Sequence, residues 1–215
     1  MGLLFVLIFQ LILIGILGLV ISGIATSFAY SKTRKKRKRK LFLSATVPFI
    51  GLYSLYFLTL FSSIIVSEQK HIDIGIGDAW YLPLPEDCEF LMIDVTDEAD
   101  IIFRQEAIVS RISHMQLVGT TAYLKLVGGR LATFDFETRN LYDYHSVEEM
   151  IEENELSDFE LLEVDDFYSN QRWKIAGAET LLGMFFSVLG SLIIVCAFSF
   201  LVLRDWQSRN SVQSV

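Results

Sequence analysis

Three long uncharged stretches dominate the pattern of apolar and polar residues, at residues 3–30, 41–66 and 180–203. A helix rises 1.5 Å per residue, so about 20 apolar residues cross a bilayer core of about 30 Å. Each stretch is therefore predicted to be a transmembrane helix. A cleaved signal peptide is the competing interpretation of the first stretch. We favour a span, because the stretch begins uncharged, runs too long and carries its basic residues afterwards.

The segment between the second and third stretches, residues 67–174, has the shorter periodicity of strands and turns. Thr121–Val127 and Arg130–Glu137 flank Gly128-Gly129, a pair that suits the two-residue turn of an antiparallel hairpin. Ala132, Phe134 and Phe136 alternate with Thr133 and Asp135, the pattern of a half-buried strand. Four further short runs fit strands and lie at Leu141–Tyr144, Trp80–Leu84, Glu89–Val95 and Ile101–Arg104.

One short helix is predicted after the hairpin, because Ser146 and Glu149 have the spacing of a capping box. It should run to about Glu155 and bury Val147, Met150 and Ile151. Asp158–Phe167 fits either a strand or a helix. The predicted fold class is three transmembrane α-helices plus a small α+β extracytoplasmic domain, mainly an antiparallel β-meander.

This order of elements, with the run Phe136–Tyr144 followed by Ser146–Glu149, resembles the hydrophilic domains of small, uncharacterised bacterial inner-membrane proteins. The resemblance implies a β-rich extracytoplasmic domain on a bacterial membrane protein. It implies no function and no catalytic residue.

Charge is divided sharply along the chain. Residues 1–66 hold eight Lys or Arg and no acidic residue, so all 26 acidic residues lie from Glu68 onward. The chain is 52% hydrophobic with a mean hydropathy of +0.43. A soluble enzyme, a secreted disulfide scaffold and a disordered chain are excluded as descriptions of the whole.

The basic residues predict the orientation, because short cytoplasmic loops carry an excess of Lys and Arg. Residues 31–40 are assigned to the cytoplasm with the tail 204–215, and the N-terminus and residues 67–179 to the outside. We interpret the basic residues as a topology anchor that rests on anionic head groups. The alternative is a specific binding site for anionic lipid or nucleic acid. The basic residues are Lys32, Arg34, Lys35, Lys36, Arg37, Lys38, Arg39 and Lys40.

The spans contain no ionisable group, which argues against a transporter or pump acting alone. Small residues recur at three- and four-residue spacing in the first and third spans, which brings helices close together. The two seams suggest that the first and third helices pack on each other, or that one faces a second copy or another protein. The seam residues are Gly15, Gly18, Ser22, Ala25, Ala29, Thr180, Gly183, Ser187 and Gly190.

The second span is rich in aromatic residues, and Pro48 should kink it. The hydroxyls of Tyr53 and Tyr56 need partners in hydrocarbon, which Ser54, Thr59 or a neighbouring subunit would supply. We favour bundle packing for these aromatics over a lipid or quinone pocket.

No catalytic, cofactor or metal site is predicted. His71, His114 and His145 are widely separated and lack a second ligand at metal-binding spacing. Cys88 and Cys196 lie in different parts of the chain, so Cys88 is either a buried or free thiol or forms an intermolecular disulfide. The carboxylates from Asp94 to Asp100 fit an acidic turn better than a calcium loop, since the calcium-loop pattern is missing.

The leading hypothesis is a non-enzymatic protein of the bacterial cytoplasmic membrane that acts as an accessory, scaffold or sensing subunit. Its partners would be lipids with anionic head groups and either another protein or a second copy. Nucleic acid is excluded as a partner, because residues 67–174 carry 24 acidic residues against eight basic ones. The alternatives are an immunity-type or inhibitor protein with an acidic face, a channel-forming oligomer, a membrane-anchored enzyme, and a eukaryotic protein with its domain in a lumen.

Overall fold

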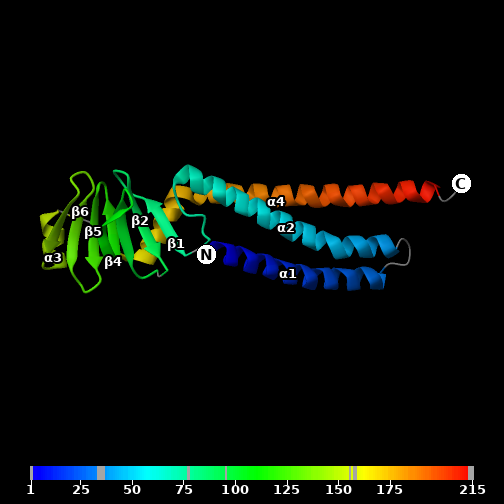
Figure 1. The fold of residues 1–215 in the computed structure, drawn as a ribbon, viewed down its shortest axis with the longest axis horizontal. Coiled ribbons are helices and arrows are strands. Elements are labelled where there is room, and N and C mark those ends of the chain that lie inside the picture. Colours follow the sequence, from blue (N-terminus) through cyan, green and yellow to red (C-terminus); the bar gives the residue numbers. More distant parts are fainter. Residues whose placement is uncertain are drawn as a thin grey trace. The chain divides into compact units, whose positions relative to one another are not determined.

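The computed structural model describes residues 2–32, 37–76, 78–94, 96–154, 156 and 159–212. Residues 66–178 form one compact unit, the sheet unit, while residues 1–65 and 179–215 form a second, the helix unit. The elements along the chain (Figure 1) are α1 (Gly2–Lys32), α2 (Arg37–Lys70), β1 (Ala79–Pro83), β2 (Cys88–Ile93), β3 (Ala99–Phe103), β4 (Glu106–Val118), β5 (Thr121–Leu126), β6 (Leu131–Asp135), β7 (Asn140–Tyr144), α3 (Val147–Glu153), β8 (Leu162–Glu163) and α4 (Val164–Val212).

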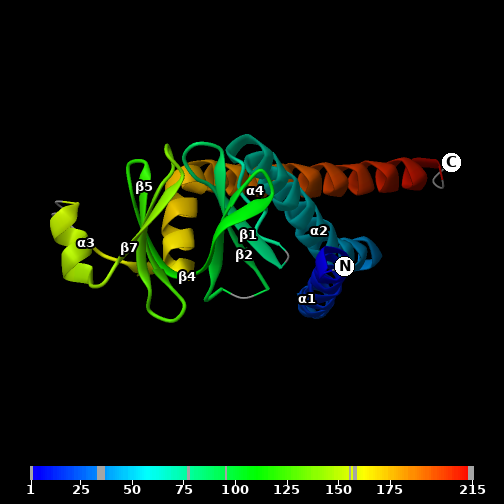
Figure 2. The same cartoon turned by 60° about the vertical axis from the view of Figure 1, so that its left-hand side comes forward.

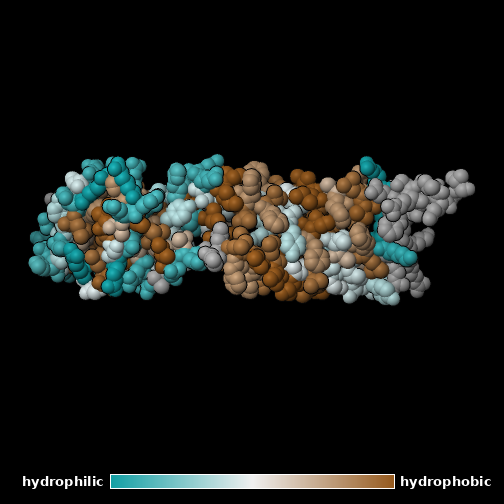
Figure 3. All heavy atoms as spheres, in the orientation of Figure 1, coloured by the Kyte–Doolittle hydropathy of each residue, from teal (hydrophilic) through white to brown (hydrophobic). Residues whose placement is uncertain are grey.

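Three helices are long and apolar enough to cross a membrane, over Leu4–Ser31, Lys38–Lys70 and Val164–Arg204. Each contains one of the uncharged stretches, and Figure 3 shows hydrophobic surface along these helices. The chain is therefore a multi-pass membrane protein by length and composition. The third helix begins well before its apolar stretch, because α4 runs without a break from Val164. Apolar residues on one face of its first turns are buried in the sheet unit, which keeps this segment helical.

The sheet is an antiparallel meander in which β1 to β7 are neighbours in chain order. The strands predicted near Trp80, Glu89, Ile101, Thr121, Arg130 and Leu141 are all present; the last residue of the Glu89–Val95 run lies outside the described residues. The longest strand, β4, was not predicted, because its polar residues interrupt the alternation of apolar and polar positions. The predicted fold class is confirmed.

A β-bulge in β4 bends the sheet. The first half of β4 pairs with β3 up to Ile112, whereas the second half pairs with β5, and the register shifts between Ile112 and His114. Arg111 has a φ of +63°, and its N–H donates to Asp100 Oδ1 at 3.0 Å. Beyond the bulge, β3 no longer pairs with β4. There β8 pairs with β4 instead, at His114 and Met115. Such bulges increase strand bending and twist.

The bent sheet surrounds the first turns of α4, as Figure 2 shows. Phe167 and Tyr168 of α4 join the main core, and the Phe167 ring lies 5.4 Å from that of Phe90. The guanidinium of Arg139, in the β6–β7 turn, lies 3.7 Å from the centre of the Phe103 ring on β3. The sheet therefore curls far enough to bring strands distant in its order into contact.

A second, smaller core covers the other face of the sheet. Tyr123 and Leu131 pack there with Met150 of α3, and Phe159 contacts the Tyr123 ring. The strand alternation predicted from Ala132 to Phe136 is confirmed, but Thr133 on the second face is also buried, with 3% of its surface exposed. The middle of the sheet is thus covered on both faces.

Local signals predicted the helix cap and the position of the hairpin, but not the length of its turn. Ser146 Oγ accepts the N–H of Glu149 at 3.1 Å, and Glu149 accepts the N–H of His145, so the predicted capping box is present with a shifted second bond. The predicted two-residue hairpin turn is wrong, because Leu126 N–H donates to Arg130 at 2.8 Å and closes a longer loop. In the run Asp158–Phe167, the first residue lies outside the described residues, residues 159–161 are in neither a strand nor a helix, and the rest is divided between β8 and α4.

We expect Phe136→Ala to destabilise the sheet unit by about 3–5 kcal/mol, since it deletes a fully buried ring. Cys88 is 2% exposed, so its rate of modification by a thiol reagent reports opening of the unit in a Cys196→Ser background. The variant should be modified at least about a hundredfold faster than the parent. Tyr142→Ala, at a half-exposed edge position, is the control and should change the rate little. Equal rates for the two variants would contradict the assigned core.

Candidate functional site

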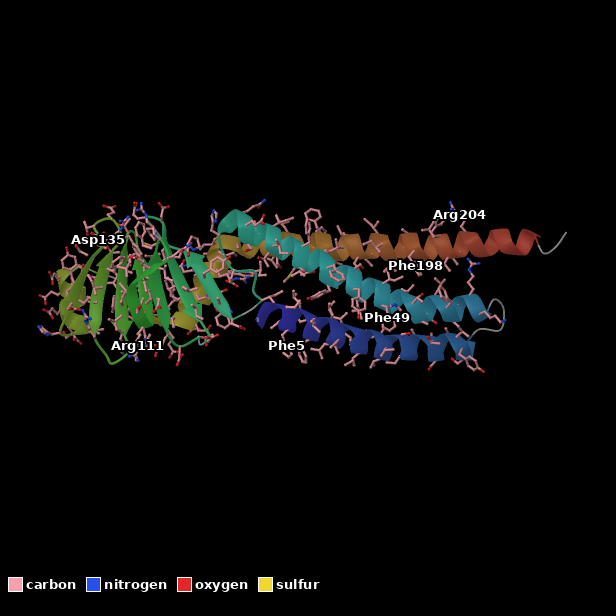
Figure 4. The ribbon with its side chains drawn as sticks, in the orientation of Figure 1. Phe5, Phe49, Arg111, Asp135, Phe198 and Arg204 are labelled. Atoms are coloured by element: carbon pink, nitrogen blue, oxygen red, sulfur yellow. The ribbon has the colours of Figure 1, made fainter. Side chains whose placement is uncertain are left out.

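Large side chains of α2 fill the glycine positions of α1. A Cβ added at Gly15 would lie 2.9 Å from the Tyr53 hydroxyl oxygen, and one at Gly18 would lie 2.9 Å from the Phe49 ring. Figure 4 labels Phe49 where α2 runs beside α1. Glycine therefore lets these two helices approach closely.

Glycine residues also let α4 approach α2 closely. A Cβ at Gly190 would lie 2.9 Å from Leu58, and one at Gly183 would clash with the Ser62 hydroxyl. Both seams thus face α2, which lies between α1 and α4 in Figure 1. The expectation that the first and third helices pack on each other is corrected, because the bulky partners of both seams belong to the aromatic second helix.

Burial of the seam residues agrees with this arrangement. Gly18, Ser22 and Ser187 are buried, whereas the other members are half-buried, namely Gly15, Ala25, Ala29, Thr180, Gly183 and Gly190. Gly23 faces open space in α1, with no atom within 4 Å of an added Cβ. Whether any seam also contacts a second copy stays a prediction.

Hydrogen bonds between helices pair the polar groups of the spans. Tyr56 donates to Gln10 Oε1 at 2.9 Å, and Tyr53 donates to the Leu11 carbonyl at 3.2 Å. Both acceptors lie on α1, not at the expected Ser54 or Thr59. Gln10 was not predicted as an acceptor, because its contact with Tyr56 joins residues 46 positions apart.

Serine hydroxyls continue this pairing along both interfaces. Ser22 donates to the Ala45 carbonyl at 2.8 Å between α1 and α2. Ser191 donates to the Gly51 carbonyl at 2.9 Å and lies 2.9 Å from the Ser54 hydroxyl, between α2 and α4. Backbone and side-chain polar groups that meet in hydrocarbon are thereby satisfied.

An apolar groove of about 360 Å³ runs along α2 near Pro48. Its walls come from α2 and α4, with Ile21 from α1, and the hydroxyl of Ser191 is already hydrogen-bonded. The groove thus offers van der Waals contact but no convergent polar groups. It is lined by Ile21, Val47, Pro48, Gly51, Leu52, Leu55, Val188, Ser191, Leu192 and Val195.

The basic segment has one buried member among its described side chains. Lys38 and Lys40 are exposed, whereas Arg39 is 8% exposed and its Nε has no hydrogen-bond partner among the described residues. The other basic residues predicted to anchor the topology or contact anionic lipid lie outside the described side chains. They are Lys32, Arg34, Lys35, Lys36 and Arg37.

A buried carboxylate in the sheet unit was missed by the sequence analysis. Asp73 is 4% exposed and accepts the hydroxyl of Tyr168 and the N–H of Gly75, the latter at 2.7 Å. Arg172 Nε lies 3.8 Å from Asp73 Oδ1, within ion-pair range but too far for a hydrogen bond. A charged residue between Ile72 and Ile74 was the local signal that could have revealed it.

This cluster joins the segment after α2 to the first turns of α4. Burial, followed by the hydrogen bond to Asp73, raises the pKa of Tyr168 well above its usual range, so its hydroxyl stays a donor. Gly75 has a φ of +75°, and a Cβ there would lie 3.2 Å from Arg172 Nη2. The carboxylate of Asp73 is satisfied by these donors, whereas Arg172 Nε has no hydrogen-bond partner among the described residues, and the contacts are those of a structural cluster.

The remaining candidate groups are dispersed. Cys88 is buried, and burial raises the pKa of its thiol, which disfavours the reactive thiolate. In the acidic turn, Glu98 and Asp100 both bind Arg111. Within the described part of the chain, no group of three or more His, Cys, Asp or Glu residues could hold a metal ion.

Comparison with known proteins gives no relative. The sequence matches no protein-family model and no curated protein, and the structure matches no solved structure at a significant level.

Gly18→Leu should separate α1 from α2, because the new side chain would occupy the space of the Phe49 ring. Thr26 Oγ1 and Ser44 Oγ lie 3.3 Å apart, so cysteines at these two positions should form a disulfide across the interface. We expect Gly18→Leu to reduce the cross-linked fraction several-fold. Gly23→Leu is the matched control and should leave it unchanged; an equal effect of both would refute the assigned interface.

Asp73→Asn should weaken the sheet unit by about 1–3 kcal/mol, because buried donors lose a charged acceptor. Tyr168→Phe removes one of these donors and should have a smaller effect in the same direction. The rate of Cys88 modification measures both, with Asp78→Asn at an exposed position as the control. Rates for Asp73→Asn no higher than for the control would show that the cluster contributes nothing to stability.

Proposed function

We propose that this chain is a non-enzymatic accessory subunit of a bacterial cytoplasmic-membrane assembly, which holds its acidic sheet unit outside and its basic loop in the cytoplasm. The observation that carries the proposal is the use of the polar groups in the spans. Tyr53, Tyr56 and Ser191 are engaged in helix-to-helix hydrogen bonds. They hold the helices together, and the uncharged stretches contain no Asp, Glu, Lys, Arg or His for ion or proton transport.

Much apolar surface remains for a partner. The side chains of Leu19 on α1 and Phe186 on α4 are 65% and 64% exposed. Lipid covers such surface by default, so an assembly partner has to compete by close packing. The outward faces of α1 and α4 are the candidate contact surfaces, since the inward faces are occupied by α2.

A sensing role is supported by the continuity of α4. The same helix carries Phe167, in the core of the sheet unit, and the uncharged third stretch from residue 180. A ligand or protein that altered the packing around Phe167 would act directly on a membrane-spanning element. Asp73 ties the residues that follow α2 to the same segment through Tyr168.

A photoreactive side chain at position 186 tests for the partner. We expect ultraviolet irradiation of intact cells to yield a discrete protein adduct, identified by mass spectrometry. Position 187 is the matched control, because Ser187 is 3% exposed and faces the bundle. Adducts of lipid alone at position 186, repeated at position 19, would contradict an accessory-subunit role.

Cysteine accessibility tests the proposed orientation. In a chain whose own two cysteines are replaced, Val118→Cys on the sheet unit should react with an impermeant thiol reagent added outside intact cells. Thr33→Cys in the basic segment should react only after permeabilisation, because basic loops stay in the cytoplasm. The opposite result would overturn the orientation.

A further inference from the structure

Arg39 is a buried basic residue at the start of α2. Its side chain is 8% exposed, and its Nε makes no hydrogen bond within the described part of the chain. A buried charged donor that loses water needs an acceptor to offset the cost of desolvation. Its sequence neighbours Lys38 and Lys40 are exposed and do not have this need.

The chain offers few anionic partners near this residue. Residues 1–66 contain no Asp or Glu, and the first turn of α2 has no acidic residue. With the basic loop in the cytoplasm, Asp205 is the sole carboxylate in the sequence on that side of the membrane. The excess of positive charge calls for an anion from outside the chain.

The start of α2 is suited to such an anion. Arg39 lies in the first turn of α2, and the first turn of a helix has N–H groups without partners inside that helix. These N–H groups and the helix dipole favour negative charge. A guanidinium also fits phosphate oxygens with two parallel hydrogen bonds.

The position along the helix indicates the source of the anion. The uncharged stretch begins at Leu41, directly after the basic segment, so Arg39 lies at the level where lipid head groups meet the hydrocarbon. We propose that Arg39 and the first turn of α2 bind the phosphate of an anionic phospholipid. This inference rests on the proposed membrane orientation but not on the existence of a protein partner.

The test uses the full-length protein in a mild detergent, with lipid binding followed by native mass spectrometry. Phosphatidylglycerol is the probe and phosphatidylcholine the neutral control. We expect Arg39→Gln to weaken phosphatidylglycerol binding by about tenfold, as for loss of a charge-assisted hydrogen bond. Lys40→Gln removes the same charge from an exposed position and should weaken binding less than about threefold.

A second variant guards against misfolding. Arg39→Lys keeps the charge but loses the planar fork, so it should fold and still bind more weakly than the parent. Equal effects of Arg39→Gln and Lys40→Gln would overturn the proposal, because they would indicate diffuse attraction. Equal retention of phosphatidylcholine would do the same.

Two further arms identify the acceptor. If millimolar inorganic phosphate stabilises the lipid-free protein as strongly as phosphatidylglycerol does, and Arg39→Gln abolishes this, the ligand is a free anion and the lipid assignment fails. If Asp205→Asn reproduces the effect of Arg39→Gln, the partner is a carboxylate of the chain and the proposal fails. Photo-crosslinking at position 186 distinguishes these failures from failure of the subunit hypothesis, since it probes the apolar surface of α4 and does not involve Arg39.

Discussion

Val164, Phe167 and Ala176 present one face of α4 to the curved sheet, and the rest of the sheet unit depends on this contact. A meander of short antiparallel strands has two exposed edges and needs an apolar cover on at least one face. The bulge at Arg111 bends β4, so that strands on either side of the bend reach the same helix. Without that bend, a flat sheet would cover only one side of α4.

The helices of the helix unit are held together by a different physical effect. Lipid tails are as apolar as leucine, so burial of apolar surface gives little driving force for helix association in a bilayer. The glycines at positions 15, 18, 183 and 190 remove side-chain bulk on α1 and α4, and α2 supplies the side chains that fill the space. Shape and hydrogen bonds therefore position α2 between the two other helices.

The elements that sequence predicted well are those specified by local signals. A run of uncharged residues defines a span, and Ser146 with Glu149 defines the start of α3, because each signal acts within a few residues. The strand β4 was missed because Ser110, Arg111, Ser113 and His114 interrupt its apolar pattern at the bulge. The hairpin was found, but its loop length depends on backbone geometry that two glycines do not specify.

Contacts between residues far apart in the chain could not be predicted from the sequence. Small residues at helical spacing predict a close contact but carry no information about which helix supplies it, so the seams were assigned to each other instead of to α2. Asp73 and Tyr168 lie 95 residues apart and meet only once the sheet has curled. Arg39 is one of eight similar basic residues, and its burial, which sets it apart from the described Lys38 and Lys40, is visible only in three dimensions.

The distribution of polar groups connects these observations to function. In the spans, hydroxyl and amide groups bond across helix interfaces, and the groove beside Pro48 keeps apolar walls. In the sheet unit, the buried charge of Asp73 is satisfied by Tyr168 and Gly75. The Nε atoms of Arg39 and Arg172 are buried without a hydrogen-bond partner among the described residues, and the acceptor proposed for Arg39 is a lipid phosphate. This pairing of polar groups within each unit supports the proposed role in attachment and assembly.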